Sequence, residues 1–422
     1  MSNRIGRPML VMALALLAAC AGEQPTEPGA MEAARGGNPG GNATPLTAAP
    51  GSLSFLIPSS TSATVTARVQ FVGVITAATS DADCATVSPL SLPATKPAGS
   101  SVYVATFTIT AVEQGNCVIT LTDKRGGTAS VTVQVRELPP VDGTRLLYSF
   151  SDADFESNVH SSNPDGSGAG QVIAGDGVER MAVYTPDRSK IVYVSDEAGS
   201  LNLFRANADG TGKEQLTFYD LGTHVGAGTL TPAVSPDGQQ IAFVLSTGFS
   251  GQPIHIYVMD AAPGATPVAI TAGNSRNLDP TYTPDGRIVF SSGSLDAGEL
   301  DDGVVNHSIH VMAANGANLT RLTVYDVDTH HNPAVSADGA TIAFTSTSFG
   351  AAASGLFLVD IDGQNQRRLT TSDSDASPVF APNGEWLAFT RFHELHADLM
   401  VLKLGRPESE VLNLTNTEAD EF

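Results

Sequence analysis

Histidine and carboxylate side chains recur at one register of an internal repeat, six to eight positions before a turn of the Pro-Asp-Gly type. Adjacent histidines near carboxylates, such as His330 and His331, can bind a metal ion or titrate near neutral pH. We expect the polar residues of this register to converge at one mouth of a channel and to bind a ligand there. They are Glu179, Arg180, Asp279, His330, His331, Asn332 and Asp375.

A shared proline supports this register. In four copies of the repeat a proline falls five positions before the turn Asp or Asn, at Pro232, Pro280, Pro333 and Pro378. We expect His331 and Asp279 to face solvent, so that their replacement weakens binding with little effect on folding. The alternative is that these groups only hydrate the channel and tie adjacent loops together. If binding survives both replacements, the opposite mouth, with the acidic loop of residues 296–302, becomes the better candidate.

Other groups of metal-type ligands fit known sites less well. His393 and His396 are three positions apart, whereas the His-Glu-x-x-His motif needs four to place both on one helical face. We interpret them as a solvated connection between strands. The acidic loop of residues 295–303 has oxygen ligands for calcium but lacks the spacing of an EF-hand loop. The sequence has no Gly-x-Ser-x-Gly elbow, so we expect no nucleophilic catalysis. We assign no catalytic residue, no metal ligand and no cofactor, and whether a divalent metal binds stays open.

The elements that must position these groups are short β-strands, which repeat along the chain after residue 140. The clearest copy, from Thr231 to Phe243, has a strand, the turn Pro236-Asp237-Gly238 and a second strand. Proline presets φ, aspartate can bond nearby backbone and glycine accepts positive φ, which together favour a tight hairpin turn. The turn recurs at intervals of 45 to 53 residues, at Asp142, Asp187, Asp285, Asp338 and Asn383.

Each repeat continues with a large, small, aromatic triplet such as Ile241-Ala242-Phe243, a third apolar run and a fourth run, which ends in Leu-Thr or Ile-Thr in five of the six repeats. Four short strands at this period are typical of β-propeller blades, so six repeats predict six blades. One blade is too small to bury both faces, and stacking must supply the core. The first repeat lacks an inner strand. Residues 417–422 are a candidate for that place, and the way the ring closes stays open.

The Ser-Pro-Asp-Gly, Ile-Ala-Phe, Tyr-Val-Met-Asp and Leu-Thr elements resemble the TolB-like propeller family, also described by its Pro-Asp repeat. The resemblance implies a six-bladed propeller over residues 141–422. Propellers of this type also occur in peptidase gating domains, tricorn-like proteins and some polysaccharide lyases, so the resemblance implies fold more than function. The α/β domain that contacts the Tol partners in TolB has no match in this sequence.

The N-terminal residues 1–19 have a basic start and an apolar run that ends in small residues before Cys20. The run is too short to span a membrane. It resembles a bacterial lipoprotein signal peptide, which implies that Cys20 carries lipid and begins the mature chain. The alternative is a plain secretion signal. Residues 20–50 are rich in Gly, Pro, Ala, Glu and Thr, which predicts a flexible tether.

Residues 51–138 alternate apolar and polar side chains in several runs, including 63–69, 103–110 and 128–135. This pattern predicts a small β-sandwich, and the stretch resembles bacterial Ig-like domains. With Cys20 lipidated, Cys84 and Cys117 are the remaining cysteines. In an exported chain such a pair predicts one disulfide, with free buried thiols as the alternative.

The chain is acidic, with a formal net charge of -22, which repels nucleic acid. We therefore expect an all-β lipoprotein anchored in the bacterial cell envelope, facing the periplasm or the exterior, whose propeller binds a protein or glycan ligand. One alternative is a carbohydrate-active enzyme, similar to polysaccharide lyases, with a His/carboxylate site at the channel mouth. A partner of peptidoglycan-associated proteins is the third hypothesis. The ligand, the membrane leaflet and the oligomeric state stay open.

Overall fold

The computed structural model describes residues 46–57, 61–141, 143–151, 157–175, 177–220, 227–247, 252–295, 306–323, 328–348, 354–393, 396–415 and 420–421. The leader, Cys20 and most of the tether lie outside these residues. Over the described ranges the regular elements are β-strands, with one 3-10 turn (η1, Glu408–Glu410), so the fold is all-β. None of these ranges contains a helix long and apolar enough to cross a membrane. The chain divides into two compact units between Leu138 and Pro139.

The first unit is a sandwich of two sheets around one core. One sheet has the order β1-β3-β7-β5, formed by Thr47–Ala49, Ser62–Val69, Tyr103–Ala111 and Ala85–Ser88. The other has the order β2-β9-β8-β4-β6, formed by Ser52–Ile57, Thr128–Glu137, Gly115–Asp123, Val74–Thr79 and Ser91–Pro93. Buried residues alternate with exposed ones along these strands, and Phe55, Phe107 and Val133 meet in the core.

The sandwich begins earlier than residue 51, because β1 pairs with β3 and Leu46 is buried in the core. A strand of three residues is too short to show alternation, so the sequence pattern did not separate it from the tether. Cys84 and Cys117 are joined by a disulfide, which links the start of β5 to β8 and so connects the two sheets.

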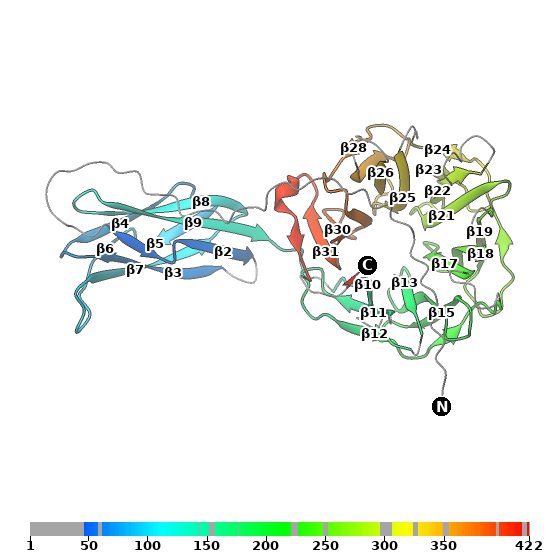
Figure 1. Ribbon diagram of the computed structural model, residues 1–422, viewed down its shortest axis with the longest axis horizontal. Helices are drawn as coiled ribbons and strands as arrows, with labels where there is room; N and C mark the ends of the chain where they lie inside the picture. The colour runs from blue at the N-terminus through cyan, green and yellow to red at the C-terminus, as the bar shows by residue number, and fades with distance from the viewer. Residues whose placement is uncertain are drawn as a thin grey trace, which may run out of the picture. The chain divides into compact units, whose positions relative to one another are not determined.

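The second unit is a ring of six blades, each with four strands (Figure 1). Blade 1 contains β10 (Leu146–Ser151), β11 (Ser157–Ser162), β12 (Gly170–Ile173) and β33 (Asp420–Glu421). Blade 2 contains β13 (Glu179–Tyr184), β14 (Lys190–Ser195), β15 (Asn202–Asn207) and β16 (Glu214–Gln215). Blade 3 contains β17 (Ala227–Val234), β18 (Gln240–Thr247), β19 (His255–Asp260) and β20 (Val268–Ala269).

The remaining blades follow the same order. Blade 4 contains β21 (Ser275–Tyr282), β22 (Ile288–Ser294), β23 (Ser308–Met312) and β24 (Thr320–Arg321). Blade 5 contains β25 (Asp328–Val335), β26 (Thr341–Ser348), β27 (Gly355–Asp360) and β28 (Arg367–Arg368). Blade 6 contains β29 (Asp375–Phe380), β30 (Trp386–Phe392), β31 (Ala397–Lys403) and β32 (Leu412–Asn413). Figure 1 shows the first strand of each of blades 2 to 5 next to the centre of the ring.

The C-terminal tail closes the ring. Its strand β33 pairs antiparallel with β10, with Glu421 opposite Phe150 and Asp420 opposite Ser151. The tail thus occupies the inner position that the first repeat lacks. On its other side Asp420 pairs with Ala397 of β31, so blades 1 and 6 share one continuous sheet.

The triplets explain how the blades stack. The large and aromatic residues of a triplet, such as Ile288 and Phe290, pack against the preceding blade, where they meet Ala242 and Ile256. The middle residue faces the following blade, as Val289 does against blade 5. Successive strand residues point to opposite faces of a sheet, so three adjacent residues can serve both interfaces.

The threonines of the Leu-Thr and Ile-Thr pairs have a hydrogen-bonding role. In blades 2 to 6 the threonine hydroxyl accepts a hydrogen bond from a backbone N–H near the start of the third strand. The donor and acceptor pairs are Leu203 and Thr217 at 2.9 Å, Ile256 and Thr271 at 3.0 Å, Ile309 and Thr323 at 2.9 Å, Leu356 and Thr370 at 3.0 Å, and Leu399 and Thr415 at 3.1 Å. The hydroxyl satisfies a backbone donor that the two-residue fourth strand leaves unpaired.

Candidate functional site

The inner strands of blades 2 to 6 share a β-bulge, visible as a register shift at the same place in each strand. One residue of each bulge has a positive φ, between 46° and 55°, although none of the five is glycine. These residues lie six positions before the turn Asp or Asn and are Met181, Thr231, Asp279, Asn332 and Ser377. We call them the bulge ring. Each of them is half-buried.

Contacts between neighbouring blades link members of the bulge ring. The Asn332 N–H donates to Asp279 Oδ2 at 3.2 Å, and the Thr231 N–H donates to Met181 Sδ at 3.3 Å. The Ser377 N–H donates to Thr345 Oγ1 of blade 5 at 3.1 Å. In these three places a side chain of one blade fixes the backbone of the next.

The backbone of the bulge ring is strained. In four of the five bulges the positive-φ residue precedes a proline, a position at which extended backbone is normally preferred. Left-handed backbone is also unfavourable for residues other than glycine, least so for asparagine and aspartate. Strain of this kind persists only where surrounding structure enforces it, and it concentrates at functional sites. The ring is therefore the strongest candidate for the channel-mouth site.

Asp279 and Asn332 are the two predicted site residues that the structure brings together in this ring. Burial raises the pKa of the Asp279 carboxyl to about 6, and the hydrogen bond from the Asn332 backbone opposes that shift. Near neutral pH, Asp279 is therefore charged but easily protonated. The side chain is half-buried and does not face solvent freely as expected.

The two adjacent histidines do not act as a pair. His330 is buried, with its ring centroid 4.9 Å from that of Phe344 and its Nδ1 2.8 Å from Thr323 Oγ1. His331 turns to the other face of β25, where its ring centroid lies 4.7 Å from that of His307. Burial, followed by the charges of His330 and Arg276, lowers the pKa of His331 to about 4. The prediction that these side chains titrate near neutral pH is wrong for His331, because alternation along the strand places it in a half-buried contact.

The acidic residues at the start of two inner strands are internal. Glu179 is fully buried and accepts a hydrogen bond from Ser195 Oγ at 3.1 Å, and burial raises the pKa of its carboxyl. Asp375 is 1% exposed and forms a bidentate ion pair with Arg391, at 2.6 and 2.9 Å. Both carboxyls tie an inner strand to the second strand of its own blade. The expectation that they offer charge to a ligand is therefore corrected.

Arg180 is less deeply buried than these two carboxyls. It is half-buried on β13, and burial lowers the pKa of its guanidinium. Its Nε is among the buried polar atoms without a hydrogen-bond partner. This donor is available to a ligand or to water that enters the channel.

The strand that leads into the acidic loop, β22, ends at the end of the propeller where the inner strands begin. β22 ends at Ser294, opposite Ser275 at the start of β21, and the Leu295 N–H donates to Asn274 O at 2.8 Å. The chain thus enters residues 296–302 from the end at which the inner strand begins, and the expectation that this loop marks the opposite mouth is wrong. The loop residues themselves lie outside the described ranges.

Three side chains that can bind metal ions lie together in blade 6 of the propeller. His393, His396 and Asp398 place one ligand atom each within 4.8 Å of one another. The sequence pattern had separated the two histidines from Asp398, which lies in the following strand. The short separation of His396 and Asp398 in the sequence was the signal that could have shown them to lie close together.

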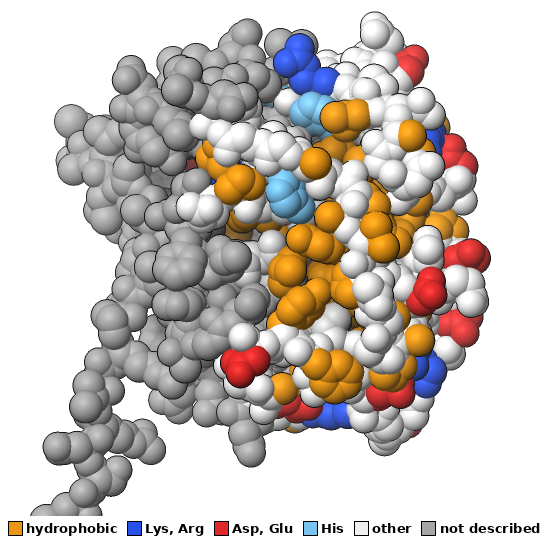
Figure 2. All heavy atoms as spheres, turned by 90° about the vertical axis from the view of Figure 1, so that its right-hand side faces the viewer, with side chains coloured by type: hydrophobic (Ala, Val, Ile, Leu, Met, Phe, Trp, Pro, Cys, Tyr) orange, Lys and Arg blue, Asp and Glu red, His pale blue; other side chains and the backbone are white. Residues whose placement is uncertain are grey.

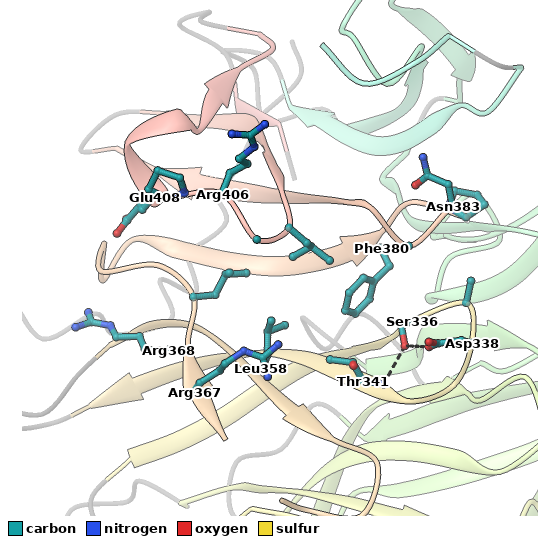
Figure 3. Close-up of a pocket in the computed structure, with 17 residues that line it drawn as sticks. Ser336, Asp338, Thr341, Leu358, Arg367, Arg368, Phe380, Asn383, Arg406 and Glu408 are labelled. Atoms are coloured by element: carbon teal, nitrogen blue, oxygen red, sulfur yellow. Dashed lines mark hydrogen bonds between the residues drawn. The ribbon is translucent and has the colours of Figure 1, made fainter. Parts of the chain in front are cut away.

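The outer surface offers two further features. A hollow of about 770 Å³ between blades 5 and 6 has Arg367 and Arg368 on one wall and Arg406 with Glu408 on the other (Figure 3). Arginines of this kind can hold a carboxylate. Hydrophobic side chains also gather on the side formed by blades 3 and 4, and acidic side chains lie mainly along one edge of this face (Figure 2).

Part of the propeller is similar in sequence to known proteins. Residues 221–420 match the family model described as the TolB beta propeller domain, PD40. Over residues 221–420 the propeller is of the TolB-like type. A protein named TolB homolog from Chlorobium chlorochromatii is 30% identical over 159 residues, which cover 37% of this chain and 31% of that protein. The Tol-Pal system protein TolB of Francisella tularensis is 28% identical over 209 residues, 49% of this chain and 44% of that protein.

Solved structures agree on the fold. The structure of TolB from Acinetobacter baumannii superposes with a TM-score of 0.53 at 19% identity, covering 73% of this chain and 79% of that chain. A chain of hydrazine synthase from Kuenenia stuttgartiensis gives a TM-score of 0.52 at 16% identity, covering 67% of this chain and 46% of that one. These two structures are named for different functions but share the propeller, so the similarities are evidence for the fold alone. The chain spans less than half the length of the curated relatives cited above.

Proposed function

We propose that this chain is a recognition protein of the bacterial cell envelope, whose TolB-like propeller binds an envelope protein at the bulge ring. The observation that carries the proposal is the match between residues 221–420 and the TolB propeller, a match shared with a relative named for the Tol-Pal system. In this proposal the lipid on Cys20 holds the protein to a membrane, with the propeller facing the periplasm or the exterior. A glycan is the other class of ligand, since its hydroxyl groups can pair with polar side chains such as those of Asp279 and Asn332.

The bulge ring supports a binding role through its backbone. The N–H groups of Asn332 and Thr231 are held by Asp279 and Met181 of the preceding blade, so a ligand that takes over one of these bonds would contact two neighbouring blades. A preformed ring also limits the ordering cost that binding must overcome. Because the chain is acidic, a basic or neutral ligand surface fits better than an acidic one.

Three of the residues expected for the carbohydrate-active enzyme hypothesis are buried inside the propeller. Proton transfer to or from a sugar needs an acid or base within hydrogen-bonding reach of the substrate. His330 is buried against Phe344, and Asp375 is paired with Arg391. Glu179 is fully buried and accepts a hydrogen bond from Ser195 through Oε1, while its Oε2 is without a hydrogen-bond partner. Asp279 is the predicted residue that could still serve as an acid or base, because burial raises its pKa to about 6.

The test measures binding to the purified chain. The probes are a purified peptidoglycan-associated protein from the same bacterium and proteins captured from an envelope extract. Asp279→Asn removes a charge from the bulge ring and should weaken binding at least tenfold at pH 7, a typical effect for a charge at an interface centre. Asp237→Asn is the matched control, because Asp237 is an exposed residue of a turn at the other end of blade 3. Equal binding by Asp279→Asn and wild type would exclude the bulge ring as the site.

The anchor is tested separately. Cys20→Ala should leave the precursor unprocessed or release the protein from the membrane fraction, and mass spectrometry of the wild type should show a lipid on Cys20. Unchanged membrane association, with no added mass on Cys20, would contradict lipid anchoring while leaving the binding proposal intact.

A further inference from the structure

The turn between β30 and β31 brings two imidazoles and a carboxylate to one point. The His393 N–H donates to His396 O at 2.7 Å, which closes the turn, and the two rings stack with centroids 4.7 Å apart. Asp398 lies in β31, and His396 is two residues earlier, directly before the strand. Asp398 Oδ2 lies 3.1 Å from His393 Nε2 and 3.7 Å from His396 Nε2.

Hydrogen bonds fix the carboxylate before any ligand arrives. The Asp398 side chain is 3% exposed. Asn413 Nδ2 donates to Asp398 Oδ2 at 2.8 Å, and Thr415 Oγ1 donates to Asp398 Oδ1 at 3.2 Å. Outer bonds of this kind orient metal ligands and are as important as the ligands themselves. The histidine side chains are 40% and 28% exposed, so solvent reaches the site from the turn.

The fold does not require a charge at position 398. The equivalent residue of blade 2 is Asn202, which bonds its own threonine, Thr217, at 2.9 Å through an amide oxygen. An amide therefore satisfies the threonine as well as a carboxylate does. A buried carboxylate in its place is costly unless a cation compensates for it. Two imidazole nitrogens beside it can either carry that positive charge as protons or share it with a metal ion.

The distances suit a metal ion. Zinc binds imidazole nitrogen at about 2.0–2.1 Å and carboxylate oxygen at about 2.0–2.2 Å, so ligand atoms in a tetrahedral site lie about 3.3 Å apart. The two separations from Asp398, 3.1 and 3.7 Å, bracket this value, and all three ligand atoms lie within 4.8 Å of one another. Calcium and magnesium prefer oxygen ligands, whereas imidazole suits zinc, copper and nickel. We propose that His393, His396 and Asp398 bind a divalent transition-metal ion, for which Zn²⁺ is the best fit, with at least one coordination position left open.

The site lies beside the seam of the ring. Ala397, between His396 and Asp398, pairs with Asp420 of the C-terminal strand β33. A metal ion that fixes the turn to Asp398 would therefore hold the start of β31 in place for this pairing. Metal binding should stabilise the folded propeller, because a ligand that binds only the native state raises its stability by mass action.

The test uses the purified chain, stripped with chelator and then dialysed against Zn²⁺. We expect wild type to retain one equivalent of Zn²⁺ by elemental analysis, and His393→Ala/His396→Ala to retain none at this site. Asp398→Asn, which copies Asn202 of blade 2, should bind at least tenfold more weakly. His255→Ala is the matched control, since His255 occupies the position equivalent to Asp398 in blade 3 and contacts Thr271. It should bind as wild type does.

Two further readouts separate binding from misfolding. Zn²⁺ should raise the melting temperature of wild type and of His255→Ala but not of the double alanine variant, and each shift is measured against the same protein without metal. Co²⁺ should give the visible absorption of a low-coordinate site in wild type only. Zn²⁺ uptake by the double variant equal to that of wild type, or no uptake by wild type at micromolar Zn²⁺, would overturn the proposal and leave protonated histidines as the partners of Asp398.

Discussion

Asp279 shows how a single half-buried group in the bulge ring links stability to pH. Its folded pKa of about 6 lies above the ordinary value of 3.8 because burial disfavours the charged form. The folded state therefore keeps a proton that the unfolded state has lost between those two pH values. Stability from this group is present below pH 3.8, falls as pH rises toward 6, and changes little above.

Asp279→Asn should remove this dependence. Asparagine keeps an oxygen for the Asn332 N–H and tolerates positive φ. We expect the variant to gain stability over wild type as pH rises from 4 to 6, and to be more stable at pH 7 by on the order of 1 kcal/mol, since water screens a half-buried group. Denaturant unfolding at several pH values measures the difference.

The comparison with wild type controls for other titrating groups. His331 has a lowered pKa, of about 4, and so contributes stability that is present above pH 6.5 and is lost as pH falls through 4. This opposite trend is common to both proteins and cancels in the difference. A difference that does not change with pH would show that burial does not shift the Asp279 carboxyl.

The repeated threonines give a second prediction for single residues. Thr370 is fully buried, and its hydroxyl accepts the Leu356 N–H at 3.0 Å. Thr370→Val keeps the shape of the side chain but leaves that buried donor unpaired, which should cost about 1–3 kcal/mol of unfolding free energy. Thr370→Ser retains the hydroxyl and should cost less. If both variants lose the same stability, the methyl group and not the hydrogen bond is the important part of the pair.

Among the elements, the inner strands contain the strain. Thr231 is β-branched, has a φ of 46° and precedes Pro232. Its Oγ1 is also a buried atom without a hydrogen-bond partner. Both features destabilise the folded state, because β-branched residues are unfavourable in left-handed backbone and a buried hydroxyl needs a partner.

Thr231→Gly should therefore stabilise the propeller by about 1 kcal/mol, since relief of backbone strain exceeds the added freedom of the unfolded chain. Ser377→Val, which places a β-branched residue at the equivalent position of blade 6, should destabilise it. Thermal unfolding of both variants measures the effect. If Thr231→Gly is more stable yet binds its partner less well, the strain serves binding, whereas a loss of stability would show that the Thr231 side chain supports the bulge.

Prediction from sequence succeeded where a local signal matched a local structure. The turn residues and triplets determine hairpins and blade interfaces through their own conformational preferences, and the structure has them at the predicted places. The positive φ of residues such as Asn332 was not predicted, because a residue before proline normally favours extended backbone. The internal roles of Glu179 and Asp375 were missed for another reason, because their partners, Ser195 and Arg391, lie on the next strand, sixteen residues away.

At the scale of the whole molecule, closure of the ring depends on two residues. Blades 2 to 6 are continuous in sequence, whereas blade 1 takes β33 from the C-terminus. Without β33, the backbone groups of β10 that face Asp420 and Glu421 would be exposed as a strand edge. In a ring of repeats each blade is stabilised by its neighbours, so loss of one junction weakens the whole stack.

A chain that ends at Thr415 should therefore unfold its propeller at a lower temperature, by several degrees for each 1 kcal/mol lost in a domain of this size. The sandwich has its own core and should melt as in the full chain, which provides an internal control. A second control replaces residues 416–422 by an equally long Gly/Ser sequence, which restores length and can offer backbone but not the native side chains. Full recovery with this sequence would show that backbone pairing with β10 closes the ring, and partial recovery would assign the rest to the native tail. An unchanged melting temperature after truncation would contradict closure by β33 and leave the contacts between blades 1 and 6 as the seam.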